Sequence, residues 1–152
     1  MSHTDPIVIG GAACTPMGSF QGDFSALAAH DLGAAVIRAA VERAGIAPQQ
    51  VDEVLMGNCL MAGQGQAPAR QAALEAALPK SAGAVTLSEM CGAGMRAATF
   101  AHDMLAAGSA EVVYRSFCKF RFARWEAGLP GEVRRRVGAG AAHLARRARF
   151  MV

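Results

Sequence analysis

Short apolar runs alternate along this chain with stretches in which apolar residues recur at helical spacing, and this alternation restricts the fold more than any other feature. It predicts four buried strands, at 7–13, 54–60, 84–87 and 112–113. Helical spacing fills the intervals at 25–45, 68–78 and 95–108. Strands that alternate with helices imply right-handed crossovers and a mainly parallel sheet with helices on both faces. We therefore expect an α/β fold.

Residues that begin and end helices support these boundaries. Ser25 is expected to cap the first long helix, and Gly45 to end it in a left-handed conformation. Pro48 is expected in the first turn of a short helix. Pro68 opens the next helix, and Pro79 prevents it from continuing.

The composition changes abruptly near residue 114. Residues 1–113 carry ten acidic and five basic side chains, a net charge of −5, so a total of +3 leaves +8 for residues 114–152. This tail holds ten of the fifteen Lys and Arg residues. We predict one α/β domain over 1–113 and a basic tail over 114–152 that is disordered or weakly helical.

The cysteines and the apolar stretches indicate a cellular compartment. The four cysteines form no CxxC pair, and the chain begins with no basic patch followed by an apolar run. No stretch offers the roughly 20 apolar residues that a membrane-spanning helix needs. We expect a soluble, cytoplasmic protein with reduced cysteines and no membrane partner.

Cys91 is the residue placed best to act as a nucleophile. It follows a predicted strand and precedes a predicted helix, where free backbone amides and the helix dipole favour a thiolate. Small residues at 92–94 leave room for a substrate. A cysteine in an apolar segment is nevertheless more often inert packing, so position alone leaves both interpretations open. Packing is the favoured interpretation for the remaining cysteines: Cys14, Cys59 and Cys118.

A second motif overlaps the same residues. Gly92 to Ala97 fits the GxGxxG/A pattern of dinucleotide-binding loops, with Glu111 about 20 residues further on. The match is weak, because Glu111 begins the next predicted strand, whereas a ribose-binding acid belongs at the far end of that strand.

Several segments in collinear order resemble the thiolase family. They are Ala12 to Phe20, His30 to Gly33, Met56-Gly57, Ala62 to Gln66, Pro68 to Gln71, Met90 to Ala97 and Leu105 to Val113. The segment around Cys91 resembles the one that carries the acylated nucleophile of these enzymes. Three residues depart from the usual pattern: Cys14 stands in place of Arg, Ala67 in place of Asn and Ala93 in place of Ser.

The resemblance implies an acyltransferase like acetyl-CoA acetyltransferase, acting in fatty acid metabolism. Cys91 would accept the acyl group from a coenzyme A thioester, which is a substrate, so no cofactor and no metal are expected. The fold it implies is the first βαβαβαβ repeat of a thiolase with the second repeat absent. The full family member would be a homo-oligomer.

The resemblance also implies that catalytic parts are missing, because a second cysteine and an activating histidine come from the C-terminal half in this family. His102 lies eleven residues after Cys91 on one predicted helix, about 16 Å away, too far to be the base. For His3, His30 and His143 a solvated or structural role is favoured. We expect the chain to be truncated after Val113, by a frameshift or an incomplete gene model, and inactive alone.

Two alternatives to catalysis remain. The chain would be a non-catalytic fragment or an interaction module whose Arg-rich stretches, 134–136 and 146–147, contact phosphates or anionic lipid. A basic run without a nucleic-acid-binding motif is more often simply solvated, so nucleic acid is not the expected partner.

Overall fold

The computed structural model describes residues 7–19, 22–59 and 61–118. The helices are α1 (Ala29–Ala44), α2 (Pro68–Glu75) and α3 (Ala93–Ala106), with single 3₁₀ turns η1 (Pro48–Gln50) and η2 (Met90–Gly92). The strands are β1 (Glu53–Asn58), β2 (Gly83–Leu87) and β3 (Val113–Cys118).

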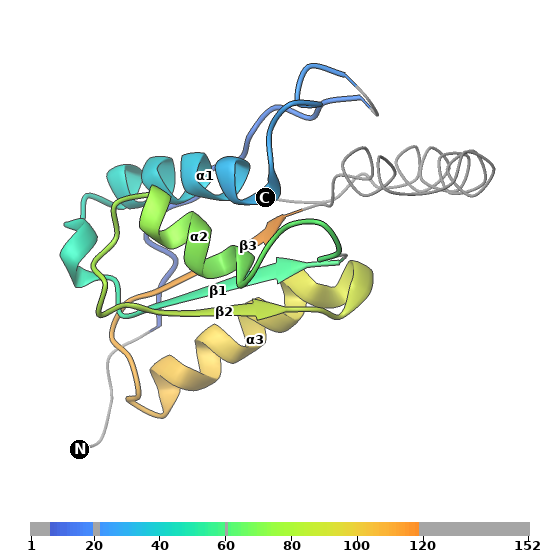
Figure 1. Cartoon of the computed structure of the whole chain (residues 1–152). Coiled ribbons are helices and arrows are strands. Elements are labelled where there is room, and N and C mark those ends of the chain that lie inside the picture. Colours follow the sequence, from blue (N-terminus) through green and yellow to red (C-terminus); the bar gives the residue numbers. More distant parts are fainter. Residues whose placement is uncertain (1–6, 20–21, 60, 119–152) are drawn as a thin grey trace.

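The three strands form one parallel sheet in the order β2-β1-β3. Helices α1 and α2 cover one face of the sheet, and α3 covers the other (Figure 1). The predicted α/β architecture with a parallel sheet between helices is therefore confirmed for the described strands.

Alternate residues of β1 supply the two cores. Val54 and Met56 are buried on the side of α1 and α2, whereas Leu55 packs with residues of α3 on the opposite face. Gly33 lets α1 approach closely, since a Cβ there would lie 3.0 Å from the Cβ of Ala72 and 3.1 Å from the sulfur of Met56. At this contact α1 packs closely through small residues and not through large aromatic side chains.

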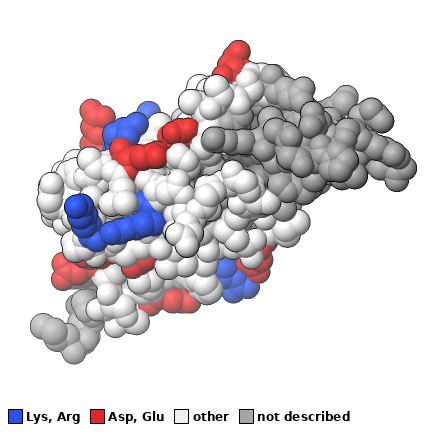
Figure 2. Space-filling view, in the orientation of Figure 1, with Lys and Arg blue, Asp and Glu red and all other residues white. Residues whose placement is uncertain are grey.

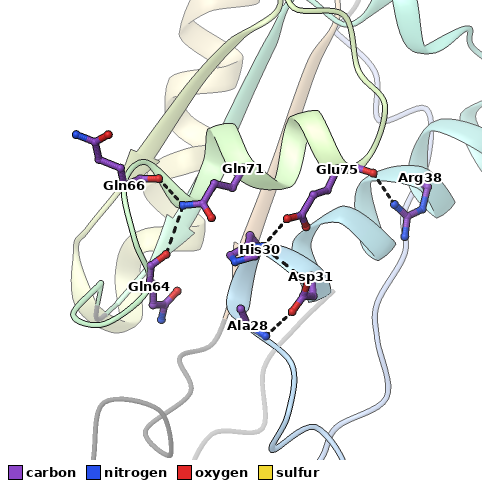
Figure 3. A network of polar contacts seen from close by, with 8 residues as sticks. All are labelled: Ala28, His30, Asp31, Arg38, Gln64, Gln66, Gln71 and Glu75. Carbon is purple, nitrogen blue, oxygen red and sulfur yellow. Dashed lines mark hydrogen bonds and ion pairs between the residues drawn. The ribbon is translucent and has the colours of Figure 1, made fainter. Parts of the chain in front are cut away.

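Polar contacts also join α1 to α2 (Figure 3). Nδ1 of His30 lies 2.8 Å from a carboxylate oxygen of Glu75, and Arg38 donates to the backbone oxygen of Glu75 over 2.8 Å.

The predicted cap of α1 at Ser25 is wrong. The helix begins at Ala29, and Asp31 accepts the backbone N–H of Ala28 over 2.5 Å. Gly45 ends α1 with φ 67°, as predicted.

The predicted first strand, 7–13, is wrong. This segment pairs with none of the described strands, and Val8 and Ile9 are 74% and 80% exposed. Its backbone lies against α1 instead, because a Cβ at Gly11 would meet the Ala40 oxygen at 2.6 Å. Arg43 holds the segment there by donating to the oxygen of Ala12 over 2.7 Å.

Two other boundaries differ from those predicted. Helix α2 ends at Glu75 rather than near residue 78, because Ala77 takes a left-handed conformation with φ 61°. Strand β3 continues to Cys118, where a disordered or weakly helical tail was expected from 114, and Tyr114 is only 9% exposed. Residues 119–152, with both Arg-rich stretches and His143, lie outside the described residues.

Asp52 ties the beginnings of the strands together. Its backbone N–H donates to the backbone oxygen of Val112 over 3.0 Å, and its backbone oxygen accepts the N–H of Gly83 over 2.8 Å. Its carboxylate accepts the N–H groups of Glu111 and Val112 over 2.8 and 3.0 Å. These bonds, led by the one from Val112, lower the pKa of Asp52.

Within the described part of the chain, no helix has the length and apolar character needed to cross a membrane. Acidic and basic side chains are interspersed on the face seen in Figure 2.

Candidate active site

Cys91 lies at the centre of η2, the single turn that joins the end of β2 to α3. Its thiol is free and its side chain is exposed. The structure therefore places Cys91 where the sequence predicts it, between the end of a strand and the start of a helix. The residue belongs to neither the body of a strand nor the body of a helix.

The backbone around Cys91 is tightly turned. Met90 takes a left-handed conformation, φ 47°, which is unfavourable for a residue with a Cβ. The N–H of Gly92 donates to the oxygen of Glu89 over 2.9 Å, and that of Ala93 donates to the oxygen of Met90. The expectation that the neighbouring amides are free is therefore wrong for these two, because the 3₁₀ turn uses them.

Glycine at 57 brings β1 against the start of α3. A Cβ at this position would lie 2.8 Å from the backbone carbon of Ala93 and 2.9 Å from the nitrogen of Gly94. The small residues after Cys91 thus have a packing function here, in addition to the room for a substrate that the sequence suggested.

An ion pair spans the turn. Two guanidinium nitrogens of Arg96 each lie 2.9 Å from a carboxylate oxygen of Glu89, so the pair is bidentate. Arg96, by these hydrogen bonds, lowers the pKa of Glu89. The guanidinium also lies 5.6 Å from the ring centre of Phe100. The pair joins residues on either side of Cys91, and sequence reasoning missed it.

Cys59 is the second thiol at this end of the sheet. It follows β1 directly, is partly buried, and donates its S–H to the oxygen of Met90 over 2.9 Å. Asn58 beside it is fully buried, and its amide nitrogen donates to the side chain of Gln64 over 3.1 Å. One signal in the sequence points to this proximity, since the carboxyl ends of parallel strands lie at the same edge of a sheet.

The other candidate residues have other partners or belong to other elements. His102 is exposed beside Asp103, with 3.2 Å between Nδ1 and the carboxylate, and His30 pairs with Glu75 between α1 and α2. Cys14 is exposed in the N-terminal segment that borders α1. Glu111 lies near Asp52 where β3 begins, at the opposite end of the sheet from the glycines at 92 and 94. This placement disfavours a dinucleotide site.

One side-chain group has the spacing of metal ligands. His30, Asp31 and Glu75 each offer one atom within 4.8 Å of the others. Their observed contacts explain the arrangement without an ion, because His30 pairs with Glu75 and Asp31 caps the start of α1. We assign no metal to this group.

A family model for the N-terminal domain of thiolase matches residues 7–115. This chain belongs to the thiolase family. Cys91, η2 and the whole of α3 lie inside the matched range, as do β1 and β2.

Curated relatives include thiolases from bacteria and from animals. An acetyl-CoA acetyltransferase of Cupriavidus necator is 50% identical over 107 residues, which are 70% of this chain and 27% of the relative. Mitochondrial acetyl-CoA acetyltransferase B of Xenopus laevis is also 50% identical, over 70% of this chain and 26% of its own length. The chain thus spans about a quarter of these thiolases.

Solved thiolase structures agree with the fold. A thiolase from Ascaris suum in complex with coenzyme A aligns with a TM-score of 0.66 and 33% identity, over 67% of this chain and 27% of its own. An acetyl-CoA acetyltransferase from Syntrophomonas wolfei aligns with a TM-score of 0.64 and 36% identity, over 68% of this chain and 26% of its own.

Proposed function

We propose that Cys91 accepts an acyl group from a coenzyme A thioester, in an acyl transfer of the acetyl-CoA acetyltransferase type. The observation that carries this proposal is the free, exposed thiol of Cys91 in the turn before α3, inside the range that matches the thiolase domain. The names of the relatives and the coenzyme A bound to one neighbour support this substrate class.

The step proposed is a single displacement at a carbonyl carbon. The Cys91 thiolate attacks this carbon, a bond from Cys91 sulfur to carbon forms, and the bond from carbon to coenzyme A sulfur breaks. Coenzyme A leaves as a thiolate and takes up a proton. An exposed thiol is well suited to this step, because a large thioester reaches it without rearrangement of the chain.

We further propose that this chain alone stops at the acyl-enzyme. Of the two histidines that the structure describes, His30 is paired with Glu75, and His102 is eleven residues further along α3, about 16 Å from Cys91. His102 is thus outside hydrogen-bond reach of the thiol, and His30 is engaged by another side chain, so we propose neither as the general base. Complete turnover would then need a general base from outside the described residues. We propose that the full thiolase that supplies it is a homo-oligomer. A cytoplasmic location remains our prediction.

Release of coenzyme A from acetyl-CoA tests both parts of this proposal. The purified full chain should release no more than one coenzyme A per chain, measured by chromatography. Cys91→Ser should abolish the release, whereas Cys14→Ser, which alters another exposed thiol, should leave it unchanged. Failure of the full chain to release any coenzyme A would contradict acyl acceptance, and continued release would contradict the claim that the chain stops there.

A further inference from the structure

We infer that Cys59 is a resolving thiol for Cys91, so that hydroperoxides convert the two residues into a reversible intrachain disulfide. Neither residue is in a disulfide, Cys91 is exposed, and Cys59 donates its S–H to the backbone oxygen of the residue before Cys91. The inference does not depend on acyl transfer, because its reagent is a peroxide and not a thioester.

Covalent geometry limits how far apart the two residues lie. The sulfur of Cys59 is 2.9 Å from the oxygen of Met90. In a trans peptide that oxygen is about 2.8 Å from the next Cα, so the Cys59 sulfur lies within about 5.7 Å of the Cα of Cys91. In a disulfide a sulfur lies about 4 Å from the Cα of the other cysteine, so this distance must shorten by at most about 2 Å while the Cys91 side chain turns towards Cys59.

The sheet brings the two residues together for a structural reason. Gly57 of β1 is the partner of Leu87 in β2, so the chain that follows each strand leaves the sheet at the same edge. Gly57 also brings β1 against Ala93, two residues after Cys91. Cys59 and Cys91 therefore belong to adjoining segments that the fold holds in place.

Two features make the turn suited to a local rearrangement. Met90 is left-handed, a conformation that is unfavourable for a residue with a Cβ, so a rotation there that moves Cys91 relieves strain. The side chains of Met61 and Met90, which lie near the two cysteines in the sequence, are 41% and 61% exposed, so neither is held by core packing.

The reaction balances in two steps. The Cys91 thiolate attacks the O–O bond of a hydroperoxide, which gives a sulfenic acid at Cys91 and releases an alcohol, or water from hydrogen peroxide. The sulfur of Cys59 then attacks the Cys91 sulfur, an S–S bond forms and the S–O bond breaks. The leaving hydroxide takes the thiol proton of Cys59 and becomes water. A dithiol reductant reverses the link and restores both thiols.

Peptide mapping of the full chain tests the inference. Cleavage after Lys and Arg places Cys14, Cys59, Cys91 and Cys118 in four different peptides. After treatment of the reduced chain with one equivalent of hydrogen peroxide, the intact mass should fall by two hydrogen atoms. Peptides 44–70 and 81–96 should be joined, and dithiothreitol should separate them.

Matched variants separate the pair from other thiols. Cys59→Ser keeps a hydrogen-bond donor to Met90, and it should instead gain one oxygen atom at Cys91, which dimedone captures. Cys14→Ser should form the same link as the parent chain. In concentrated urea the selectivity for the pair should be lost, because it depends on the fold.

Three results would overturn the inference. The first is a dominant link from Cys91 to Cys14, to Cys118 or to a second copy of the chain. The second is oxidation of Cys91 to a sulfenic acid without a disulfide in the unaltered chain. The third is an equal yield of the Cys59–Cys91 disulfide in urea. Circular dichroism of each variant shows that it is folded before oxidation.

Discussion

Gly57 and Ala93 touch backbone to backbone. A Cβ at Gly57 would lie 2.8 Å from the carbonyl carbon of Ala93, which is closer than real Cβ contacts come. This contact sets how close β1 comes to the start of α3, and so it positions the turn that carries Cys91.

Gly57→Ala should therefore destabilise the chain by about 1–3 kcal/mol, because the backbone at Ala93 must move to make room. Gly10→Ala is the matched control, since its Cβ would meet only the Cβ of Ala44 at an ordinary 3.7 Å. Urea unfolding followed by circular dichroism measures both. Equal stability of the two variants would show that the contact at Gly57 is not restrictive.

Two exposed alanines just after helices should respond to glycine in opposite directions. Ala77 has φ 61°, so Ala77→Gly removes left-handed strain and should stabilise the chain by about 0.5–1 kcal/mol. Ala107 has φ −75°, which suits a residue with a Cβ, so Ala107→Gly should destabilise the chain by roughly 0.5–1 kcal/mol. Thermal unfolding should show one melting temperature rising and the other falling.

Asp52 should contribute a stability that depends on pH. Its pKa is lowered in the folded chain by the N–H groups of Val112 and Glu111, so the contribution is present above its unfolded pKa near 3.8. It is lost as the pH falls through the lower folded value. The carboxylate is exposed, so solvent screening keeps the effect below about 1 kcal/mol.

Asp52→Asn tests this directly. The variant should lose part of its stability at pH 6 and be closer to the parent chain near pH 3, as measured by urea unfolding at each pH. A difference from the parent chain that stays constant between pH 3 and 6 would show that ionisation of Asp52 is not the cause.

Local signals were enough to place most helices and strands. Gly45 ended α1, and Pro68 opened α2, where their backbone preferences require. The apolar run in β1 predicts a strand, because a strand buried on both faces needs no alternation of polar and apolar residues.

The failures that concern strands have a common cause, which is that pairing partners lie far away in the sequence. The run at 7–13 has strand composition, but composition does not say whether a neighbouring strand is available, and the segment packs on α1. Tyr114 to Cys118 lies in the predicted tail, and the family match ends within this segment, at residue 115. These residues nevertheless pair with β1 through backbone atoms, which need no particular sequence. The bond from Cys59 to Met90 joins residues 31 apart for the same reason.

The location of an acetyl group tests the central claim most directly. The full chain is incubated with acetyl-CoA labelled with carbon-13 in the acetyl group, digested after Lys and Arg, and mapped by mass spectrometry. We predict the label on peptide 81–96, at Cys91, and its absence from that peptide in Cys91→Ser. A label on the peptides of Cys14, Cys59 or Cys118 instead, or no label on a folded chain, would contradict the role of Cys91 as the acyl acceptor.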